Sequence, residues 1–499
     1  MRNRYILTFA LLLGWSTTAL SQNTVNVSNA DFAADTDYTW TADKEYLLTD
    51  MVFVKPGSRL FIEAGTIVRG DLGNGNDATG LVVARGAQIF AEGTPDRPII
   101  FTSVVDDPIG TGTSANRGLW GGLVVLGAAS TNNATEGGVK LVEGVNEIAS
   151  PESLAEYGGT NDEDNSGVIR YVSIRHTGIN VGDQAGNEIQ GLTLGGVGSG
   201  TTIEYVESFA SNDDGFEWFG GTVNTKYLVS AFNTDDAFDW DEGFRGKGQF
   251  WFSIQDNGSA DGFGRAFEFD GATGDENTEP YGMGWVVNST ILGAGTDVTT
   301  NAGDGSQLMM LRDNTGGKFY NNIFADTWNT ALTVEDIDNT GSKPLDSRQR
   351  LEAGDIVFEN NLWFGFGAGN SAAGLSSQDF VQSYLTGAGT GNTLEDPSFR
   401  SISRTAGSGA LDPRLAAGSP AMTGAVDVDD PFFTKVAYKG AFGSRNWLAG
   451  WTALDQLGYL AADTPSGTTV NISNADLAAD TDYTWTADKE YLLTDMVFV

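Results

Sequence analysis

The pattern of hydrophobic and polar positions along this chain is that of short strands separated by glycine-rich turns. Apolar and polar residues alternate in "MVFVKPGSRLFIEAGTIVRGD", from Met51, and in "GLVVARGAQIFAEGTPDRPIIFTS", from Gly80. Alternation with a period of two is typical of strands with one buried side, and Gly, Pro and Asn are favoured where the chain turns. Short helices are predicted only near residues 151–157 and 446–460. The pattern therefore predicts an all-β protein.

Internal repetition indicates which all-β architecture to expect. "IEYVESFASNDDGFEWFGG" and "TKYLVSAFNTDDAFDWDEG" match at an offset of 22, which aligns Tyr205 with Tyr227 (227 − 205 = 22). "AFEFD", ending at Asp270, is a looser third copy of the same tail. A fixed offset of one coil length is expected of a solenoid, in which equivalent residues stack about 4.8 Å apart. The prediction is a right-handed parallel β-helix with capping segments and about twenty residues per coil.

Stacking in such a helix gives specific expectations for repeated side chains. Three phenylalanines one coil apart should stack in the interior: Phe216, Phe238 and Phe267. Three asparagines of "VVNSTI", "FYNNIF" and "FENNLW" should form a ladder of amides at a turn: Asn288, Asn321 and Asn360. Five aromatic residues beside the acidic turns either fill the core or form a sugar-stacking platform: Trp218, Phe219, Trp240, Trp251 and Phe252. Core filling is favoured because these aromatics alternate with polar residues.

The domain organisation follows from the two ends of the predicted solenoid. "MRNR", an eleven-residue apolar run and small residues before Ser21 are typical of a signal peptide, which is too short to span a bilayer as a helix. The predicted units are a signal peptide (1–21), an N-terminal cap segment (22–54), a β-helix domain with a C-terminal cap (55–460), a linker (461–468) and a truncated second copy of the cap segment (469–499).

The second copy of the cap segment repeats the first almost without change. Residues 24–54 match residues 469–499 at an offset of 445 (469 − 24 = 445), with only Val27/Ile472 and Phe32/Leu477 differing. We interpret the second copy as the start of a further β-helix in a tandem array, so that this chain is a fragment of a longer protein. Two alternatives are an artefact of sequence assembly, and a surrogate cap that docks on another molecule and builds a head-to-tail fibre.

Several of these motifs carry a resemblance to known proteins. "GAQIFAEGTPDRPIIFTS", the "NN-[IL]-[FW]" coils and "DPRLAAGSPAMTGA" resemble right-handed parallel β-helix proteins of the pectate-lyase-like superfold. With "DDGFEWFGGTVN", "DDAFDWDEGF" and "GAFGSRNWLAGWT", the chain is similar to secreted surface proteins of Bacteroidetes whose function is uncharacterised. The resemblance covers roughly residues 37–460 and implies a fold rather than an activity.

Composition narrows the expected partners. The 28 basic and 66 acidic residues give a formal net charge of −38, and there is no cysteine. Nucleic acids and anionic membranes need basic surface, so neither is expected as a partner, whereas divalent cations are favoured. No apolar run after the predicted signal peptide is long enough to span a membrane. A secreted protein without disulfides must be stabilised by a large core.

One constellation of residues is dense enough to carry chemistry. In a 22-residue register, three carboxylates of "SNDDGFEW" stack on three of "NTDDAFDWDEGF": Asp213, Asp214 and Glu217 on Asp235, Asp236 and Asp239. Two carboxylates about 5 Å apart repel by about 3 kcal/mol at an effective dielectric of 20. A cation would relieve this repulsion, and calcium accepts irregular sets of oxygen ligands. The alternative is that the Asp side chains only bond local backbone N–H groups at a turn.

The same residues also allow a catalytic interpretation. Polygalacturonases and pectate lyases, which share this superfold, place carboxylates or calcium-binding aspartates on adjacent coils, and carboxylates at such separations serve glycosidases. In that case Asp214 is the acid, Asp236 the base, and Arg245 or Arg265 binds a uronate. The only histidine, His176, is expected to be structural.

The sequence therefore favours a secreted or cell-surface β-helix that serves as a binding or structural module, adhesin-like and stabilised by calcium. Its partner would be a polysaccharide or a cell-surface molecule. The alternative is a polysaccharide lyase or glycoside hydrolase that uses the stacked carboxylates.

Overall fold

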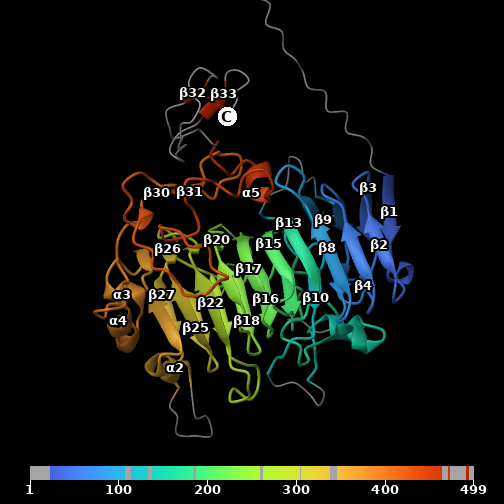
Figure 1. Ribbon diagram of the computed structural model, residues 1–499, viewed down its shortest axis with the longest axis horizontal. Coiled ribbons are helices and arrows are strands. Elements are labelled where there is room, and N and C mark those ends of the chain that lie inside the picture. The colour runs from blue at the N-terminus through green and yellow to red at the C-terminus, as the bar shows by residue number, and fades with distance from the viewer. Residues whose placement is uncertain are drawn as a thin grey trace, which may run out of the picture.

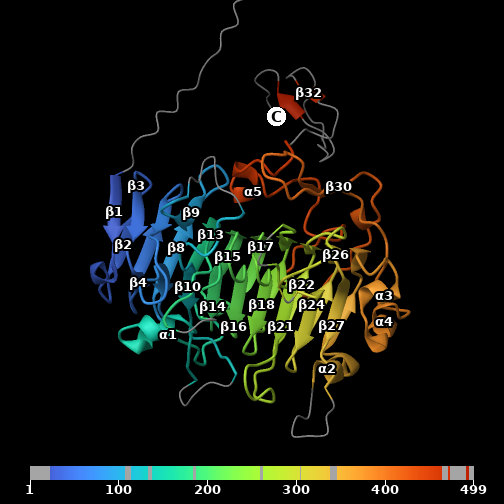
Figure 2. The same cartoon turned by 180° about the vertical axis from the view of Figure 1, so that it is seen from behind.

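The computed structural model describes residues 23–106, 114–132, 138–183, 187–258, 262–303, 305–337, 346–462, 470–472 and 491–493. The predicted signal peptide and most of the second cap copy lie outside these residues. Successive coils contribute strands to the same three faces of the helix, and equivalent strands pair in parallel (Figures 1 and 2). The expected all-β parallel β-helix is confirmed. None of the described helices is long and apolar enough to cross a membrane.

An 18-stranded sheet forms two adjoining faces of the coil. Face 1 contains β2 (Asp37–Trp40), β5 (Arg59–Ile62), β8 (Gln88–Glu92), β19 (Lys247–Gln249), β22 (Met283–Val287), β25 (Gly316–Tyr320) and β28 (Ile356–Glu359). Face 2 contains β1 (Asn23–Val27), β3 (Lys44–Leu48), β6 (Ile67–Gly70), β9 (Ile99–Ser103), β20 (Phe252–Ile254), β23 (Thr290–Leu292), β26 (Ile323–Thr327) and β29 (Leu362–Phe366). Three longer strands span both faces: β13 (Gly167–Arg175), β15 (Thr202–Phe209) and β17 (Asn224–Ala231).

A nine-stranded sheet forms face 3. Its strands are β4 (Met51–Val54), β7 (Gly80–Val83), β10 (Leu123–Leu126), β14 (Leu192–Gly195), β16 (Phe216–Phe219), β18 (Phe238–Asp241), β21 (Phe267–Asp270), β24 (Gln307–Arg312) and β27 (Thr330–Val334). Alternate residues of each strand point into the coil, where they form one continuous apolar core with the inner residues of faces 1 and 2.

The register of face 3 agrees with the predicted repeat. Phe216 pairs with Phe238, which pairs with Phe267, and the ring centroids lie 5.5 and 5.7 Å apart. Trp218 and Trp240 alternate with these phenylalanines and are fully buried. The expected interior stack of phenylalanines is therefore confirmed, and it extends to tryptophans of the same strands.

A single residue in the left-handed conformation turns the chain from face 1 to face 2 in most coils. These corner residues have φ between 50° and 60°: Tyr171, Tyr205, Tyr227, Phe250, Asn288, Asn321 and Asn360. A non-glycine residue in this conformation is uncommon, and Asn adopts it more readily than bulky residues. The tyrosine rings stack at 4.4 Å (Tyr171–Tyr205) and 4.2 Å (Tyr205–Tyr227), so packing stabilises the corners that lack Asn.

The asparagines of the later corners form two hydrogen-bonded rows. In the predicted row, Asn360 donates to the Asn321 side chain at 2.7 Å, whereas Asn288 donates to the Tyr438 backbone carbonyl. The following residues form a more continuous ladder, in which Asn322 donates to Asn361 at 3.0 Å and Asn361 to Asn392 at 3.2 Å. The stacked amides exist, and their most regular part lies one residue after the predicted positions.

Short helices close one end of the stack. In α3 (Ala372–Leu375) and α4 (Asp379–Leu385), three apolar residues join the core and cover the last coil: Leu375, Val381 and Leu385. Two further helices are η1 (Asn29–Asp31), in the first coil, and α2 (Ser347–Ala353), before β28. The seven-residue helices α2 and α4 have no counterpart among the predicted elements.

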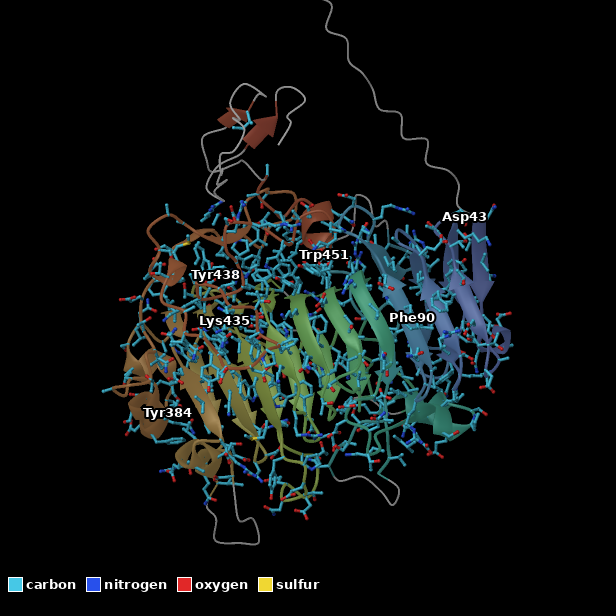
Figure 3. All side chains as sticks on the ribbon, in the orientation of Figure 1. Asp43, Phe90, Tyr384, Lys435, Tyr438 and Trp451 are labelled. Atoms are coloured by element: carbon cyan, nitrogen blue, oxygen red, sulfur yellow. The ribbon has the colours of Figure 1, made fainter. Side chains whose placement is uncertain are left out.

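After α4 the chain returns along the outer side of face 2, and we call residues 396–462 the strap (Figure 1, orange to red). Its elements are β30 (Phe399–Ser401), β31 (Asp412–Leu415), η3 (Pro420–Met422) and α5 (Ala453–Gln456). Trp447 and Trp451 lie edge-on against the stacked corner tyrosines. Trp451 is labelled in Figure 3. The buried Glu207 accepts hydrogen bonds from the backbone N–H groups of Ala453 and Leu454, which ties α5 to face 2. The predicted helix at 446–460 corresponds to α5 within this strap.

A smaller covering segment, residues 138–157, packs on the outer side of face 3 near its first strands. It contains β11 (Lys140–Leu141), α1 (Val145–Ile148), η2 (Glu152–Ala155) and β12 (Glu156–Tyr157). Its apolar residues form a separate cluster with outward residues of β4, β7 and β10.

The described residues of the second cap copy repeat the pairing of the first. β32 (Val470–Ile472) pairs in parallel with β33 (Tyr491–Leu493), so that Val470 lies opposite Tyr491. In the first copy Val25 lies opposite Tyr46, which is the same register after the offset of 445 (470 − 25 = 445). The two copies thus share strand pairing as well as sequence. The tandem interpretation of the repeat stays a prediction.

Candidate functional site

One row of outward-facing residues crosses the whole of face 3, and the polarity of its side chains changes along the row. In the order of the strands, the row is Phe53, Val82, Val124, Thr193, Glu217, Asp239, Glu268, Met310 and Thr333. The first three residues are buried under the covering segment. The fifth to seventh members, Glu217, Asp239 and Glu268, are carboxylates on successive coils. The parallel pairing places each of them directly beside the next.

A second outward position on the same strands adds two more carboxylates, Asp241 and Asp270. We call these five outward residues the acidic face: Glu217, Asp239, Asp241, Glu268 and Asp270. Four of them are inaccessible or nearly so, because Glu217, Asp241 and Asp270 are each 7% exposed and Glu268 has a 13% exposed side chain. Carboxylates that are both adjacent and buried lose hydration and repel one another.

The turn before these strands supplies the remaining predicted residues. Ligand oxygens of Asp214, Glu217 and Asp239 all lie within 4.8 Å of one another, and so do those of Asp213, Asp214 and Asp235. Asp214 belongs to both groups. The predicted stacking of Glu217 on Asp239 is present in the strand register.

Asp214 and Asp236 each use one oxygen to hold the next coil. Oδ1 of Asp214 accepts a hydrogen bond of 2.8 Å from the backbone N–H of Asp236. Oδ1 of Asp236 in turn accepts from the backbone N–H of Arg265. Both side chains are buried, Asp236 to 2% exposure. The sequence left turn capping and clustering of carboxylates as two alternatives for these residues. In the structure the two occur together.

The two arginines predicted to serve the site lie in different places. Nη1 of Arg265 lies 2.7 Å from Oε1 of Glu268 and 3.8 Å from Oδ2 of Asp236, so Arg265 borders the acidic face. Arg245 instead donates to Ser130 and Asp162 and forms no ion pair with the acidic face among the described residues. Arg312, which the sequence did not single out, pairs with Asp270 and Glu268 from the far side.

The carboxylates near Glu217 have strongly perturbed acidities. Burial first, and then repulsion from neighbouring carboxylates, raises the pKa of Asp214, Glu217 and Asp239 well above the usual range. The pKa of Asp213 is raised for the same two reasons, with Asp235 the main repelling neighbour. The arginines lie at the Glu268 and Asp270 end, so the repulsion between Glu217, Asp214 and Asp239 is not relieved by a nearby ion pair in the described part of the chain.

Glu217 has a further unusual feature. Its Oε2 is buried and makes no hydrogen bond within the described residues, and the same holds for Oδ1 of Asp239. A buried carboxylate oxygen without a donor is costly, typically by more than the 1–3 kcal/mol of a neutral group. Both residues belong to the cluster with Asp214, in which one carboxylate oxygen of each residue lies within 4.8 Å of the others. The arrangement therefore has the free oxygen ligands and the excess negative charge that a cation requires.

At the edge of the acidic face next to the covering segment, Glu242 is a weaker acid than an ordinary glutamic acid. Glu242 forms an ion pair with Lys140 of the covering segment. Burial, followed by repulsion from Asp241, raises the pKa of Glu242 to about 7. Gln190 donates to both Glu143 (3.3 Å) and Asp213 (3.4 Å), which links the covering segment to the predicted metal ligands.

The aromatic residues beside the acidic turns do not form an external platform. Trp218, Trp240 and Trp251 are fully buried within the coil, Phe252 packs under the strap, and Phe219 lies against the covering segment. Core filling, the favoured interpretation, is correct for the three tryptophans, whereas Phe219 and Phe252 lie on the outer side of the coil and are buried there by the covering segment and the strap. His176 is buried too, with Nδ1 2.5 Å from the Asn116 carbonyl and Nε2 3.4 Å from Asp106, as expected of a structural residue.

The comparisons with known proteins agree with the architecture. The model of the pectate-lyase like beta helix domain matches residues 32–401, so the chain belongs to this family. No curated protein and no solved structure matches the chain.

Proposed function

We propose that this protein is an extracellular β-helix that serves as a binding or structural module, and that Asp214 and the adjoining end of the acidic face, Glu217 and Asp239, hold calcium. The observation that carries the proposal is the cluster of buried Asp214 and Glu217 with half-buried Asp239, whose carboxylates are mutually close and partly without hydrogen-bond donors within the described residues. A bound cation would convert their repulsion of about 3 kcal/mol per pair into attraction. The cation would also replace the missing donors.

Calcium suits the donor set better than other metals. The ligands are all oxygens, which excludes the nitrogen and sulfur sites typical of zinc. The carboxylates come from a turn and two strands whose spacing is fixed by the coil, and calcium tolerates such irregular geometry with six to eight oxygens. Asp213 and Asp235, with Asp214 shared, provide for a second ion at the more exposed turn. Asp236 supports the site by holding the backbone of the next coil.

The proposed role as a module follows from what surrounds the carboxylates. The site lies between the covering segment and Arg265, and Asp214 and Glu217, its most buried members, are held among neighbouring coils. An ion at this position would join two successive coils of face 3, which is a structural task. An extracellular location agrees with this, because free calcium is abundant outside cells, with extracellular modules binding it at 10⁻⁴–10⁻³ M.

The test is a calorimetric titration of the metal-free protein with calcium, together with thermal melts in calcium and in chelator. Saturable binding and a higher melting temperature in calcium are expected. At a thousandfold excess over the dissociation constant, the stabilisation would be about 4 kcal/mol. Magnesium at the same concentration is the control and should have a smaller effect, because it requires near-octahedral geometry. Identical melts in calcium and in chelator would contradict the proposal.

A second candidate is a carbohydrate-active enzyme, and one observation favours it. Glu217, Asp239 and Glu268 are adjacent carboxylates between Asp214 and two arginines, and a carboxylic acid with a raised pKa beside a second carboxylate is the usual catalytic pair of glycosidases. An assay on acidic and neutral polysaccharides, with calcium present, distinguishes the two functions. New reducing ends or unsaturated products, lost in Asp239→Asn, would favour the enzyme. Their absence across the panel would contradict it.

A further inference from the structure

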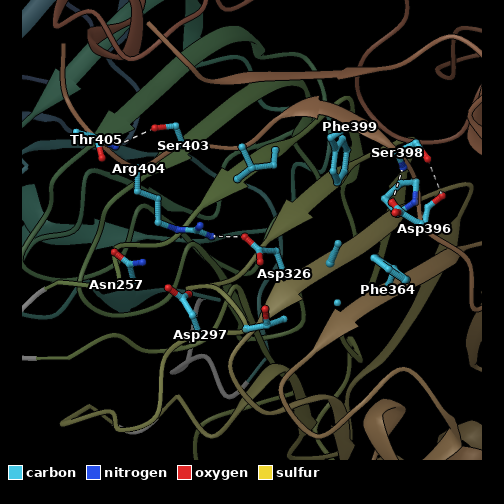
Figure 4. A pocket seen from close by; sticks show the side chains of 15 residues that line it. Asn257, Asp297, Asp326, Phe364, Asp396, Ser398, Phe399, Ser403, Arg404 and Thr405 are labelled. Atoms are coloured by element: carbon cyan, nitrogen blue, oxygen red, sulfur yellow. Dashed lines mark hydrogen bonds and ion pairs between the residues drawn. The ribbon is translucent and has the colours of Figure 1, made fainter. Parts of the chain in front are cut away.

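A cavity of about 850 Å³ lies on a different side of the molecule, between the outer surface of face 2 and the strap (Figure 4). Its floor is formed by the ends of β26 and β29, and its wall by the beginning of the strap, residues 396–405. The size is in the range of sites that hold small organic ligands. None of the acidic-face residues lines it.

The cavity opens where the strap stops covering an apolar row. The outward row of face 2 runs through Phe209, Ala231, Ile254, Leu292, Ala325 and Phe364. The strap buries its first members, whereas Phe364 at the end of the row is partly exposed and lines the cavity. Phe399 of the strap, also partly exposed, lines the cavity as well (Figure 4). The cavity therefore contains accessible aromatic surface on both of its sides.

Polar groups line the rest of the cavity. Arg404 is fixed by other coils: its Nε donates to the Gln255 carbonyl and its Nη2 to Asp326, both at 2.8 Å. Asp297 and Asn257 lie near Arg404 and are exposed to solvent (Figure 4). Nε and Nη2 of Arg404 are held by protein acceptors, and the other polar groups of the lining are carboxylates, the Asn257 amide and the hydroxyl groups of serines and threonines. The site is thus rich in hydrogen-bond acceptors.

The charge of the lining excludes anionic ligands. Three carboxylates, Asp297, Asp326 and Asp396, face one guanidinium, Arg404. The whole chain carries a formal net charge of −38, which repels anions further. A ligand of this cavity must donate several hydrogen bonds, carry no negative charge and present a flat apolar surface to an aromatic ring. A neutral pyranose has these three properties, because its hydroxyl groups lie around the edge of a ring whose faces carry C–H groups.

We propose that this cavity binds a neutral, β-1,4-linked oligosaccharide, with Phe364 stacking on a sugar ring and Asp297 accepting from its hydroxyl groups. An extended β-1,4 chain keeps its ring faces flat, so it can lie between the two phenylalanines. The strap and the last coils of face 2 both contribute, so the intact chain is needed. The proposal is independent of calcium at the acidic face.

The experiment is a calorimetric titration of the full chain with cellotetraose, xylotetraose and mannotetraose. We expect at least one of these to bind, Phe364→Ala to weaken that binding at least tenfold, and Asp297→Asn to weaken it several-fold. Thr296→Trp fills the cavity from an exposed position and should abolish binding without removing a buried group. Phe90→Ala, on the outer side of β8, is the matched control: Phe90 is partly exposed like Phe364, and binding should be unchanged.

Three outcomes would overturn the proposal. They are no binding of any of the three sugars at 10 mM, equal losses in Phe364→Ala and Phe90→Ala, and tighter binding of tetragalacturonate or spermidine at the same cavity. The double variant Glu217→Gln/Asp239→Asn separates this site from the calcium proposal. It should keep sugar binding while losing the calcium response.

Discussion

In three successive coils, face 2 places Phe209, Ala231 and Ile254 on the outer surface, whereas face 3 places Glu217, Asp239 and Glu268 there. Both rows follow the same stacking rule, in which like residues lie one strand spacing apart. Stacking apolar residues is favourable, and the strap covers the result. Stacking carboxylates is unfavourable by about 3 kcal/mol per pair at an effective dielectric of 20. The comparison indicates that the repeat stabilises the outer surface of face 2 by contact alone. On face 3 the same stacking requires a positive counter-charge.

The largest expected effect concerns the contact-stabilised surface. Trp451→Ala removes a fully buried indole that packs against Tyr171 and Tyr205. We expect a loss of about 3–5 kcal/mol in the free energy of unfolding. Denaturant titrations should give the same loss in calcium and in chelator, because this surface needs no ion. A loss found only in chelator would mean that the two surfaces are not independent.

The next effect concerns the charged surface. Glu217→Gln/Asp239→Asn removes two of the mutually repelling carboxylates and their proposed ligand oxygens. In chelator the variant should be more stable than the parent by about 1–3 kcal/mol, because repulsion is relieved. In calcium it should be less stable than the parent, because the ion no longer binds. The control Asp429→Asn changes an exposed carboxylate and should leave both values unchanged. A variant that is less stable in both conditions would contradict the comparison.

The smallest effect concerns pH. Glu242 has a pKa of about 7 in the folded protein and near 4.5 when unfolded, so the folded state binds the proton more tightly. Its contribution to stability is therefore present below pH 4.5 and is lost as the pH rises through 7. In chelator, unfolding free energy measured by denaturant should decrease between pH 5.5 and pH 8. Glu242→Gln should flatten this dependence, whereas Glu92→Gln, at an exposed position, should not. A parent protein whose stability rises over this range would refute the expected sign.

The parts of the molecule that repeat at a constant offset were predictable, and those interrupted by insertions were not. Glu217 and Asp239 are one uninterrupted coil apart (239 − 217 = 22), so the sequence predicted their contact. Glu268 follows Asp239 by 29 residues (268 − 239 = 29), and Met310 follows Glu268 by 42 (310 − 268 = 42), which hides the rest of the row. The match of "AFEFD" to the earlier coils was the signal that could have added Glu268 to the predicted cluster.

Long-range packing could not be predicted from periodicity at all. Trp447 and Trp451 belong to no repeat, and their position against the corner tyrosines depends on how the strap folds back. The same is true of Arg404, whose partners Gln255 and Asp326 lie in other coils. The sequence located the acidic turns but not the surfaces that the strap and covering segment close.

The most direct test of the central claim is a crystal structure of the protein grown with strontium in place of calcium, with anomalous differences measured. The account predicts a peak between the carboxylates of Asp214, Glu217 and Asp239, at distances slightly longer than the 2.3–2.6 Å typical of calcium and oxygen. A density map that shows these carboxylates hydrogen-bonded to one another, with no anomalous peak among them, would contradict it.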